Sequence, residues 1–440
     1  MTIQDKPLGF WTCTALIVGN VIGMGIFMLP ASLAPFGWNA FLGWAVTLIG
    51  AVFIALTFAH LARVFPSEDG PYAYMRLAFG DTTAFFVIWC YWVSIWITNA
   101  TLAISVVGYL TSLFPVLAKE LWYAPAAALF FIWFFVAIGM RGARTSGGVQ
   151  MLTTVLKLMP LLAVIVLGVY VLFADPHAYV AHLPTSGLSL SATTAAGTIA
   201  MFAMLGVESA TIPAGKVDRP EINIPRATMV GTLVAAVIYI GVSAVPLLLL
   251  PAEALAKSNA PFVDLLNRYM NADSAAWIAL FVIVSGLGAL NGWTLLVGEM
   301  TASLAHHQVF PAVFKKQNRY GAPVASLLLT GVLASAMILM NYSRSLAQGF
   351  TFLSVMVTAS NLPLYVFGAL AIFVLWRRAK ANQGSSVPKW LLVAAALSLL
   401  FNAWIAIGIG AEPMLWIVVL GLSSLPIYFF MRWWRKTRPL

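Results

Sequence analysis

The sequence predicts an all-α integral membrane protein with twelve transmembrane helices, and three observations support this fold class. First, 61% of the 440 residues are hydrophobic and only 9% are charged, whereas a soluble domain has about 45–50% apolar and about 25% charged residues. A soluble domain of this length would lack the polar surface to cover so much apolar material. Second, the apolar residues form runs long enough to cross a bilayer, and third, the basic residues between the runs are divided unevenly between its two sides.

The predicted spans follow from the thickness of a membrane. A hydrocarbon core about 30 Å thick requires about 20 helical residues at a rise of about 1.5 Å each. Helices are expected because backbone that faces lipid must satisfy its hydrogen bonds within its own segment. The apolar runs that meet this requirement cover approximately residues 10–31, 38–61, 82–112, 123–140, 151–174, 193–213, 227–250, 275–303, 323–341, 348–376, 390–409 and 412–432.

The distribution of basic residues predicts the orientation of the chain. With the N-terminus in the cytoplasm, 20 of the 24 Lys and Arg residues fall on the cytoplasmic side. The four on the outer side are Lys119, Lys257, Arg268 and Arg344. Such an excess is typical of cytoplasmic loops, so we expect both termini in the cytoplasm. The net charge of +10 then reflects topology and contact with anionic lipid rather than a nucleic-acid partner.

Two apolar runs are interrupted near their centres. The first run has three glycines and an asparagine within Gly19–Gly25, and the sixth has a glycine, a glutamate and a serine within Ala203–Ser209. Such backbone is tolerated inside a membrane only where it faces protein or water. Paired interruptions in corresponding halves of a chain indicate a transporter site at the membrane midplane. The alternative for the first run is close helix packing through its glycines.

Longer motifs around these interruptions resemble those of the amino acid–polyamine–organocation transporters. The motifs keep their order over most of the chain and are Gly19–Pro30, Leu205–Ala210, Val217–Ala227, Leu290–Leu296, Val309–Pro311 and Gly321–Val324. They are most similar to those of bacterial arginine/agmatine antiporters and basic amino acid/polyamine antiporters. The resemblance implies one domain over residues 1–440 with the leucine-transporter fold. Its two inverted five-helix repeats would cover about 10–174 and 193–376, and two extra helices would cover about 390–432.

The resemblance also implies which residues contact a substrate. Backbone groups at the two interruptions would bind the carboxylate and amine common to all amino acids, and these positions are Val21, Gly23, Met24, Gly25, Phe202 and Leu205. A second set would meet the substrate side chain and comprises Ser94, Ile95, Asn99, Trp293 and Ser354. The face of Trp293 would contribute about 0.5–2 kcal/mol against a guanidinium or ammonium group. The alternative for Trp293 is a packing role.

Three of these positions depart from the arginine/agmatine antiporter pattern. Met24 replaces a serine and removes a hydroxyl near the substrate carboxylate. Ile95 replaces a cysteine and makes the pocket narrower and more apolar. Phe202 replaces a tryptophan and retains an aromatic lid, but with a weaker cation–π attraction. These departures weaken the case for arginine itself and leave an amino acid or amine as the expected substrate.

Two ionisable residues within the predicted spans, Lys157 and Glu208, are expected to be functional, because a charge there costs at least about 2.5–3.5 kcal/mol. By resemblance, Glu208 forms the inner gate and proton-sensing group together with Tyr91 and Tyr365. Lys157 matches a lysine that replaces the sodium ion of sodium-coupled relatives. The alternatives are a Glu208 carboxylate held by neighbouring hydroxyls and a Lys157 side chain that extends to the inner surface.

The sequence therefore predicts a sodium-independent secondary transporter in a bacterial cytoplasmic (inner) membrane. It would exchange amino acids, basic ones above all, or their decarboxylated amines by alternating access. A proton-coupled symporter or an exchanger of neutral amino acids on the same fold is the alternative. Neither an enzyme nor a metal or cofactor is expected, since the sequence has no phosphate loop, zinc motif or nucleophile–histidine–acid pattern. The expected partners are a small-molecule substrate and membrane lipid, and the resemblance is compatible with a homodimer.

Overall fold

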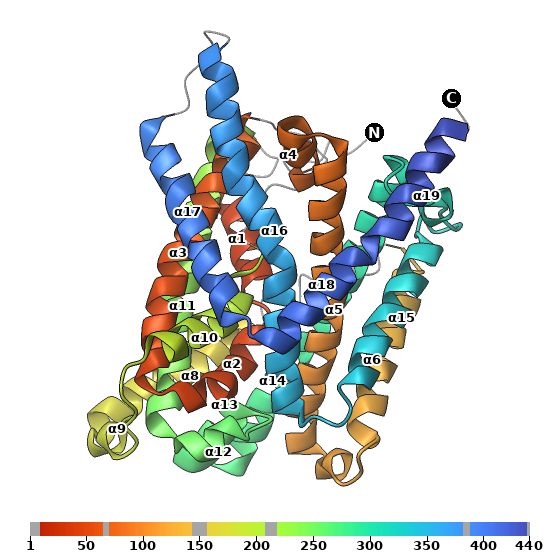
Figure 1. The fold of residues 1–440 in the computed structure, drawn as a ribbon. Helices are drawn as coiled ribbons and strands as arrows, with labels where there is room; N and C mark the ends of the chain where they lie inside the picture. Colours follow the sequence, from red (N-terminus) through yellow and green to blue (C-terminus); the bar gives the residue numbers. More distant parts are fainter. Residues whose placement is uncertain (1–8, 65–69, 143–155, 207–217, 382–387, 438–440) are drawn as a thin grey trace, which may run out of the picture.

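In the computed structural model, long helices run roughly side by side along one direction (Figure 1). The structure describes residues 9–64, 70–142, 156–206, 218–381 and 388–437, and no strand occurs within these ranges. The helices of the first part of the chain are α1 (Phe10–Val21), α2 (Gly25–Leu33), η1 (Ala34–Phe36), α3 (Trp38–Val64), α4 (Gly70–Phe79), α5 (Asp81–Leu113), η2 (Pro115–Ala118), α6 (Tyr123–Gly139), α8 (Leu158–Ala174), α9 (His177–Ala181), α10 (Leu190–Met201) and η3 (Phe202–Met204).

The remaining helices begin after the second interruption. They are α11 (Pro220–Leu249), α12 (Ala252–Ala256), α13 (Pro261–Tyr269), α14 (Ala272–His306), η6 (Ala312–Lys315), α15 (Val324–Met340), α16 (Leu346–Ala381), α17 (Lys389–Gly408), α18 (Ala411–Leu422) and α19 (Ser424–Thr437).

Among the described residues, seven helices are long and apolar enough to cross a membrane. They are α3, α5, α11, α14, α16, α17 and the pair α18–α19, and five shorter apolar helices accompany them: α2 with η1, α6, α8, α10 with η3, and α15. Each of these helices overlaps one of the predicted apolar runs. The prediction of an all-α membrane protein is therefore supported at this coarser level.

α3, α5, α14 and α16 extend beyond the predicted runs because hydropathy marks the membrane and not the helix end. α16 has 36 residues and is therefore about 54 Å long, well above a hydrocarbon core of about 30 Å. Its last turns are basic, and Arg378 donates hydrogen bonds of 2.7 and 3.2 Å to the carbonyls of Leu77 and Ala78 in α4. These contacts favour continued helix beyond the apolar run.

Burial distinguishes a central helix from a peripheral pair. In α5, 94% of the most apolar window is buried, whereas in α18–α19 the figure is 17%. α5 packs mainly against α14 and α16, and α1 packs against α11.

Both chain termini lie at the same end of the bundle, opposite α9 and α12 (Figure 1). This arrangement brings α1, α2, α5, α10, α14 and α16 around one central region.

Candidate functional site

The first predicted run is two helices with a break between them. α1 ends at Val21 and α2 begins at Gly25. Ile22 leaves the helical conformation with a ψ of 87°, and the Gly23 amide donates to the Val21 carbonyl at 2.8 Å. The interruption predicted at Gly19–Gly25 is confirmed at its C-terminal part. The helix is therefore broken here, and one of these glycines, Gly25, also packs closely against Phe202.

Two side chains from other helices bind the carbonyl groups at the end of α1. The Tyr239 hydroxyl of α11 donates to the Val21 carbonyl at 2.6 Å. Lys157 Nζ, just before α8, donates to the Ile22 carbonyl at 3.0 Å. These carbonyls have lost their helical partners, so polar side chains must satisfy them inside a membrane.

Lys157 is buried, with 5% of its surface exposed. Its ammonium group therefore binds the helix break and does not extend to the inner surface as the alternative required. Carbonyl groups at the C-terminal end of a helix carry partial negative charge, which favours a cation there. The structure thus places a positive charge directly beside the end of α1.

A second interruption follows α10. The α-helix ends at Met201, η3 continues for three residues, and Leu205 is extended with φ −68° and ψ 148°. Gly206 has a φ of 98°, a left-handed conformation that glycine adopts without steric cost. Residues 207–217, and with them Glu208, lie outside the described residues. The described part of the interruption predicted at Ala203–Ser209 therefore departs from the α-helix as expected.

The two interruptions line one pocket. It encloses about 490 Å³ of atom-free space, including space open to solvent. Its lining comes from both interruptions and from α5, α11, α14 and α16, and comprises Val21, Gly23, Met24, Gly25, Ile26, Tyr91, Ser94, Thr98, Leu102, Phe202, Ala203, Leu205, Tyr239, Trp293, Val357 and Asn361.

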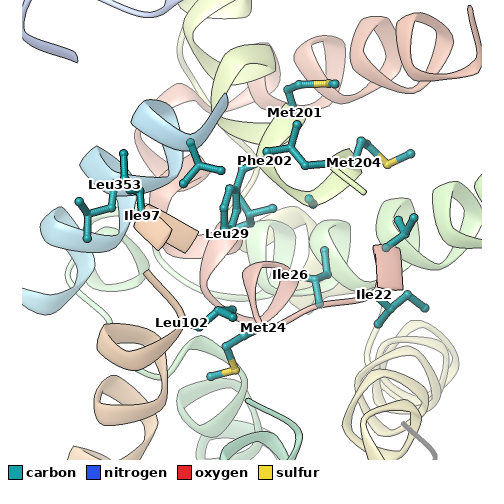
Figure 2. Packing of buried hydrophobic residues seen from close by; sticks show 14 of the residues in the cluster. Ile22, Met24, Ile26, Leu29, Ile97, Leu102, Met201, Phe202, Met204 and Leu353 are labelled. Atoms are coloured by element: carbon teal, nitrogen blue, oxygen red, sulfur yellow. The ribbon is translucent and has the colours of Figure 1, made fainter. Parts of the chain in front are cut away.

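Most residues of the predicted substrate site meet in this pocket. Eight of them line it, namely Val21, Gly23, Met24, Gly25, Ser94, Phe202, Leu205 and Trp293. Ile95, Asn99 and Ser354 are buried but do not line the pocket. Ile95 and Asn99 each follow a lining residue of α5, Ser94 and Thr98, and therefore point to another side of that helix. Ser354 lies one turn before the lining residue Val357 on α16. Figure 2 shows apolar side chains gathered at this point, with Met24 near Leu102.

The residues of the predicted gate are divided. Tyr91 lines the pocket, whereas Tyr365 lies one turn beyond Asn361 on α16 and is 1% exposed. The Tyr365 ring meets Phe58 edge to face at 5.9 Å. Of the two gate tyrosines, Tyr91 therefore borders the pocket from α5, and Tyr365 lies on α16 one turn further from the pocket than Asn361.

Seven lining residues were missed by the sequence analysis. They are Ile26, Thr98, Leu102, Ala203, Tyr239, Val357 and Asn361. A lone tyrosine or asparagine within an apolar run was the available signal, since such groups need partners in a membrane. The sequence alone does not show which face of the helix carries them.

The two departures nearest the break have visible consequences. Met24 provides no side-chain cap for α2, so no side chain occupies the amide groups at this helix N-terminus. Phe202 covers Gly25 so closely that a Cβ atom there would lie 2.7 Å from Phe202 Cε1. The Phe202 ring also meets Phe350 edge to face at 5.7 Å. An aromatic lid therefore packs directly on the start of α2.

The break presents opposite partial charges to the pocket. The Val21 and Ile22 carbonyls at the end of α1 already accept hydrogen bonds from Tyr239 and Lys157, whereas the amides at the start of α2 have no side-chain cap and attract a carboxylate. Among the described residues, no group of three or more His, Cys, Asp or Glu side chains could hold a metal ion.

The family follows from comparison with known proteins. A model of the amino acid permease family matches residues 8–431. The chain belongs to the amino acid permease family. The resemblance to this superfamily is therefore confirmed, and this permease is an integral membrane transporter and not an enzyme.

Three relatives are similar to this permease over much or nearly all of its length. A putative arginine/ornithine antiporter of Bacillus subtilis is 31% identical over 95% of both chains. The putrescine transporter PotE of Haemophilus influenzae is 29% identical over 98% of both chains. A cadaverine/lysine antiporter of Escherichia coli is 31% identical over 76% of this chain and 75% of its own.

Proposed function

We propose that this permease is a sodium-independent antiporter that exchanges basic amino acids and their decarboxylated amines by alternating access. The observation that carries the proposal is the single pocket lined by both helix interruptions. The names of the relatives support the substrate class, because they include an arginine/ornithine antiporter, a putrescine transporter and a cadaverine/lysine antiporter.

The substrate backbone would bind at the break. The carboxylate would accept hydrogen bonds from the uncapped amides at Gly25 and Ile26, and a helix N-terminus is a favourable site for an anion. The ammonium group would donate to backbone carbonyls near Ala203 and Leu205. The side chain would then extend between α5, α14 and α16, where Trp293 offers an aromatic face.

Lys157 supports transport without sodium. Its ammonium group already donates to the Ile22 carbonyl, so a protein cation occupies the position beside the end of α1. Carbonyl groups at a broken helix are typical ligands for a coupling sodium ion in transporters of this kind. A covalently attached charge at this position removes the need for a bound cation. We propose that Glu208, Tyr91 and Tyr365 gate the cytoplasmic side and that Lys157 and Glu208 couple the cycle to protons.

We further propose twelve membrane spans with both termini in the cytoplasm. The shorter helices α6, α8 and α15 have 17 residues each, or about 26 Å, which nearly covers a hydrocarbon core of about 30 Å. An even number of spans requires both termini on one side, and they lie at the same end of the bundle (Figure 1). The inverted repeats at about 10–174 and 193–376, a bacterial inner-membrane location, bound lipid and a homodimer belong to this proposal.

Exchange is tested with purified protein in proteoliposomes. Vesicles are loaded with unlabelled arginine, ornithine, lysine or putrescine, and uptake of the labelled compound is compared with uptake into empty vesicles. We expect uptake at least about tenfold faster into loaded vesicles, since an empty carrier has no ligand to stabilise the occluded state. Replacing sodium with choline is expected to change nothing.

The other outcomes distinguish the alternatives. Equal uptake into loaded and empty vesicles contradicts obligate exchange. Uptake into empty vesicles driven by a pH gradient supports the proton-coupled symporter. Competition by neutral amino acids, with none by basic ones, supports the exchanger of neutral amino acids.

A further inference from the structure

Asn361 contributes an unused hydrogen-bond acceptor to the pocket. It lies on α16, is 2% exposed and lines the pocket. Its Nδ2 donates to the Val357 carbonyl at 2.9 Å. Because a carbonyl only accepts, this bond determines which way the amide faces. The Asn361 Oδ1 atom is buried and has no hydrogen-bond partner in the described structure, a costly arrangement for a polar atom.

Two residues of α5 that line the pocket, Ser94 and Thr98, also present hydrogen-bond acceptors. The Ser94 hydroxyl donates to the Tyr91 carbonyl at 2.7 Å, and the Thr98 hydroxyl donates to the Ser94 carbonyl at 2.8 Å. A hydroxyl has one hydrogen and two lone pairs. Since both hydrogens are used within α5, the two oxygen atoms are left to accept hydrogen bonds.

The pocket lining contains no charged side chain. Asp, Glu, Lys and Arg are all missing from its described residues. A carboxylate on the substrate side chain would find no donor at Asn361 Oδ1, Ser94 Oγ or Thr98 Oγ1, and an aliphatic side chain would leave these acceptors unpaired. An ammonium or guanidinium group has only donors and matches all three.

We infer that Asn361, with Ser94 and Thr98, forms an acceptor wall that recognises the distal ammonium or guanidinium group of a basic amino acid or diamine. The inference rests on the proposed function and adds the residue that distinguishes cationic from neutral side chains. Asn361 acts as the specificity-determining residue, because its acceptor is the one with no partner. Substrate binding supplies that partner.

The chain provides a matched control for this role. Asn402 of α17 is 1% exposed, donates from Nδ2 to the Ser398 carbonyl at 2.7 Å and has an unpaired Oδ1. It has the same local geometry as Asn361 but does not line the pocket. Asn→Leu at each position removes the same groups from a buried helix.

The test is calorimetric titration of the full-length protein in detergent. Arginine, lysine and ornithine are the cationic probes, and norleucine and norvaline are probes of similar shape that lack the distal cation. We expect Asn361→Leu to weaken binding of the cationic probes about tenfold, as for loss of one hydrogen bond to a charged group. Binding of norleucine and norvaline should be unchanged, and Asn402→Leu should alter neither class.

A conservative variant separates recognition from structure. Asn361→Asp retains an acceptor oxygen in either protonation state, and as a neutral acid it also donates to the Val357 carbonyl. We expect Asn361→Asp to retain binding of the cationic probes. An equal loss for cationic and neutral probes in Asn361→Leu would overturn the inference, as would unchanged binding of both. Wild-type protein that binds no cationic probe would overturn the proposed function and the inference together.

Discussion

At the scale of single residues, the most informative contacts are the two at the end of α1. Lys157 and Tyr239 come from different helices and each binds one carbonyl that the break has released. A buried carbonyl without a partner costs about 1–3 kcal/mol. These two side chains therefore stabilise an irregular backbone that the membrane would otherwise disfavour.

Lys157→Met is expected to impair both the break and transport. Methionine retains much of the apolar stem but removes the ammonium group, so the Ile22 carbonyl loses its donor. We expect a destabilisation of about 1.5–3 kcal/mol, the usual value for a hydrogen bond to a charged group, and exchange reduced at least about tenfold. Thermal unfolding and proteoliposome uptake measure the two effects.

A lysine outside the break serves as the control for Lys157. Lys119 is exposed, and Lys119→Met removes the same charge at a position remote from the pocket. It should leave unfolding and uptake close to wild type. Uptake by Lys157→Met at the wild-type rate would show that the Ile22 contact has no part in transport.

At the scale of elements, the start of α2 depends on the absence of a side chain. Gly25 is the first residue of α2, and Phe202 from the other interruption lies over it. Contacts below about 3 Å are incompatible with a normal Cβ position, so a larger residue must displace the ring. The close approach of the two interruptions thus requires glycine at this position.

Gly25→Ala is expected to lower exchange strongly, because its Cβ would lie 2.7 Å from Phe202 Cε1. Overpacking of this kind costs about 1–3 kcal/mol, which should appear as a lower unfolding temperature. Gly23→Ala is the control for unfolding, since the nearest atom to its Cβ would be 4.0 Å away. Equal unfolding temperatures for the two variants would show that Phe202 does not restrict the start of α2.

The sequence predicted the positions of the helices well, but it predicted less well which face of each helix borders the pocket. Apolar runs located the helices because membrane thickness determines their length, and the glycine-rich stretch located the break. The face of α5 was not predicted from burial, since 94% of its most apolar window is buried, although Ser94, Thr98, Thr101 and Ser105 recur on one face at helical spacing. Ser94 lines the pocket as expected, whereas Thr98 lines it and the expected Ile95 and Asn99 do not. Met24, Phe202 and Trp293, which were expected from the resemblance of their motifs, also line the pocket.

At the scale of the whole molecule, α13 and the connection before it pack against α2 and contact α5 at Tyr109. The Tyr109 hydroxyl of α5 donates to the Phe27 carbonyl of α2 at 2.8 Å, and the rings of Phe27 and Phe262 meet at 5.4 Å. Within the connection, the Ser258 hydroxyl donates to Asp264. We propose that α2, α5 and α13 together form one seal on the side that faces outward.

The seal contains a titratable group outside the membrane spans. Burial raises the pKa of the Asp264 carboxyl, and the hydrogen bond from Ser258 opposes this rise. Alternating access requires the seal to open, and opening would expose Asp264 to water and return its pKa to the ordinary range of about 3.9. The closed form then binds a proton more readily than the open form. The stability of the closed form relative to the open form increases as pH falls through the raised pKa and is lost as pH rises.

We therefore expect the outer seal to open less often in acid. Ala260 is 4% exposed within the seal, and Ala260→Cys, with Cys13 and Cys90 replaced, reports opening through its labelling by a membrane-impermeant maleimide. Labelling rates are normalised to Lys119→Cys, which is exposed, because thiol reactivity itself depends on pH. The normalised rate should fall as the pH is lowered from about 7.5 toward the ordinary carboxyl pKa of about 3.9, and Asp264→Asn should remove the difference, since an amide does not titrate. A pH dependence that persists in Asp264→Asn would assign it to another group and leave the seal insensitive to Asp264.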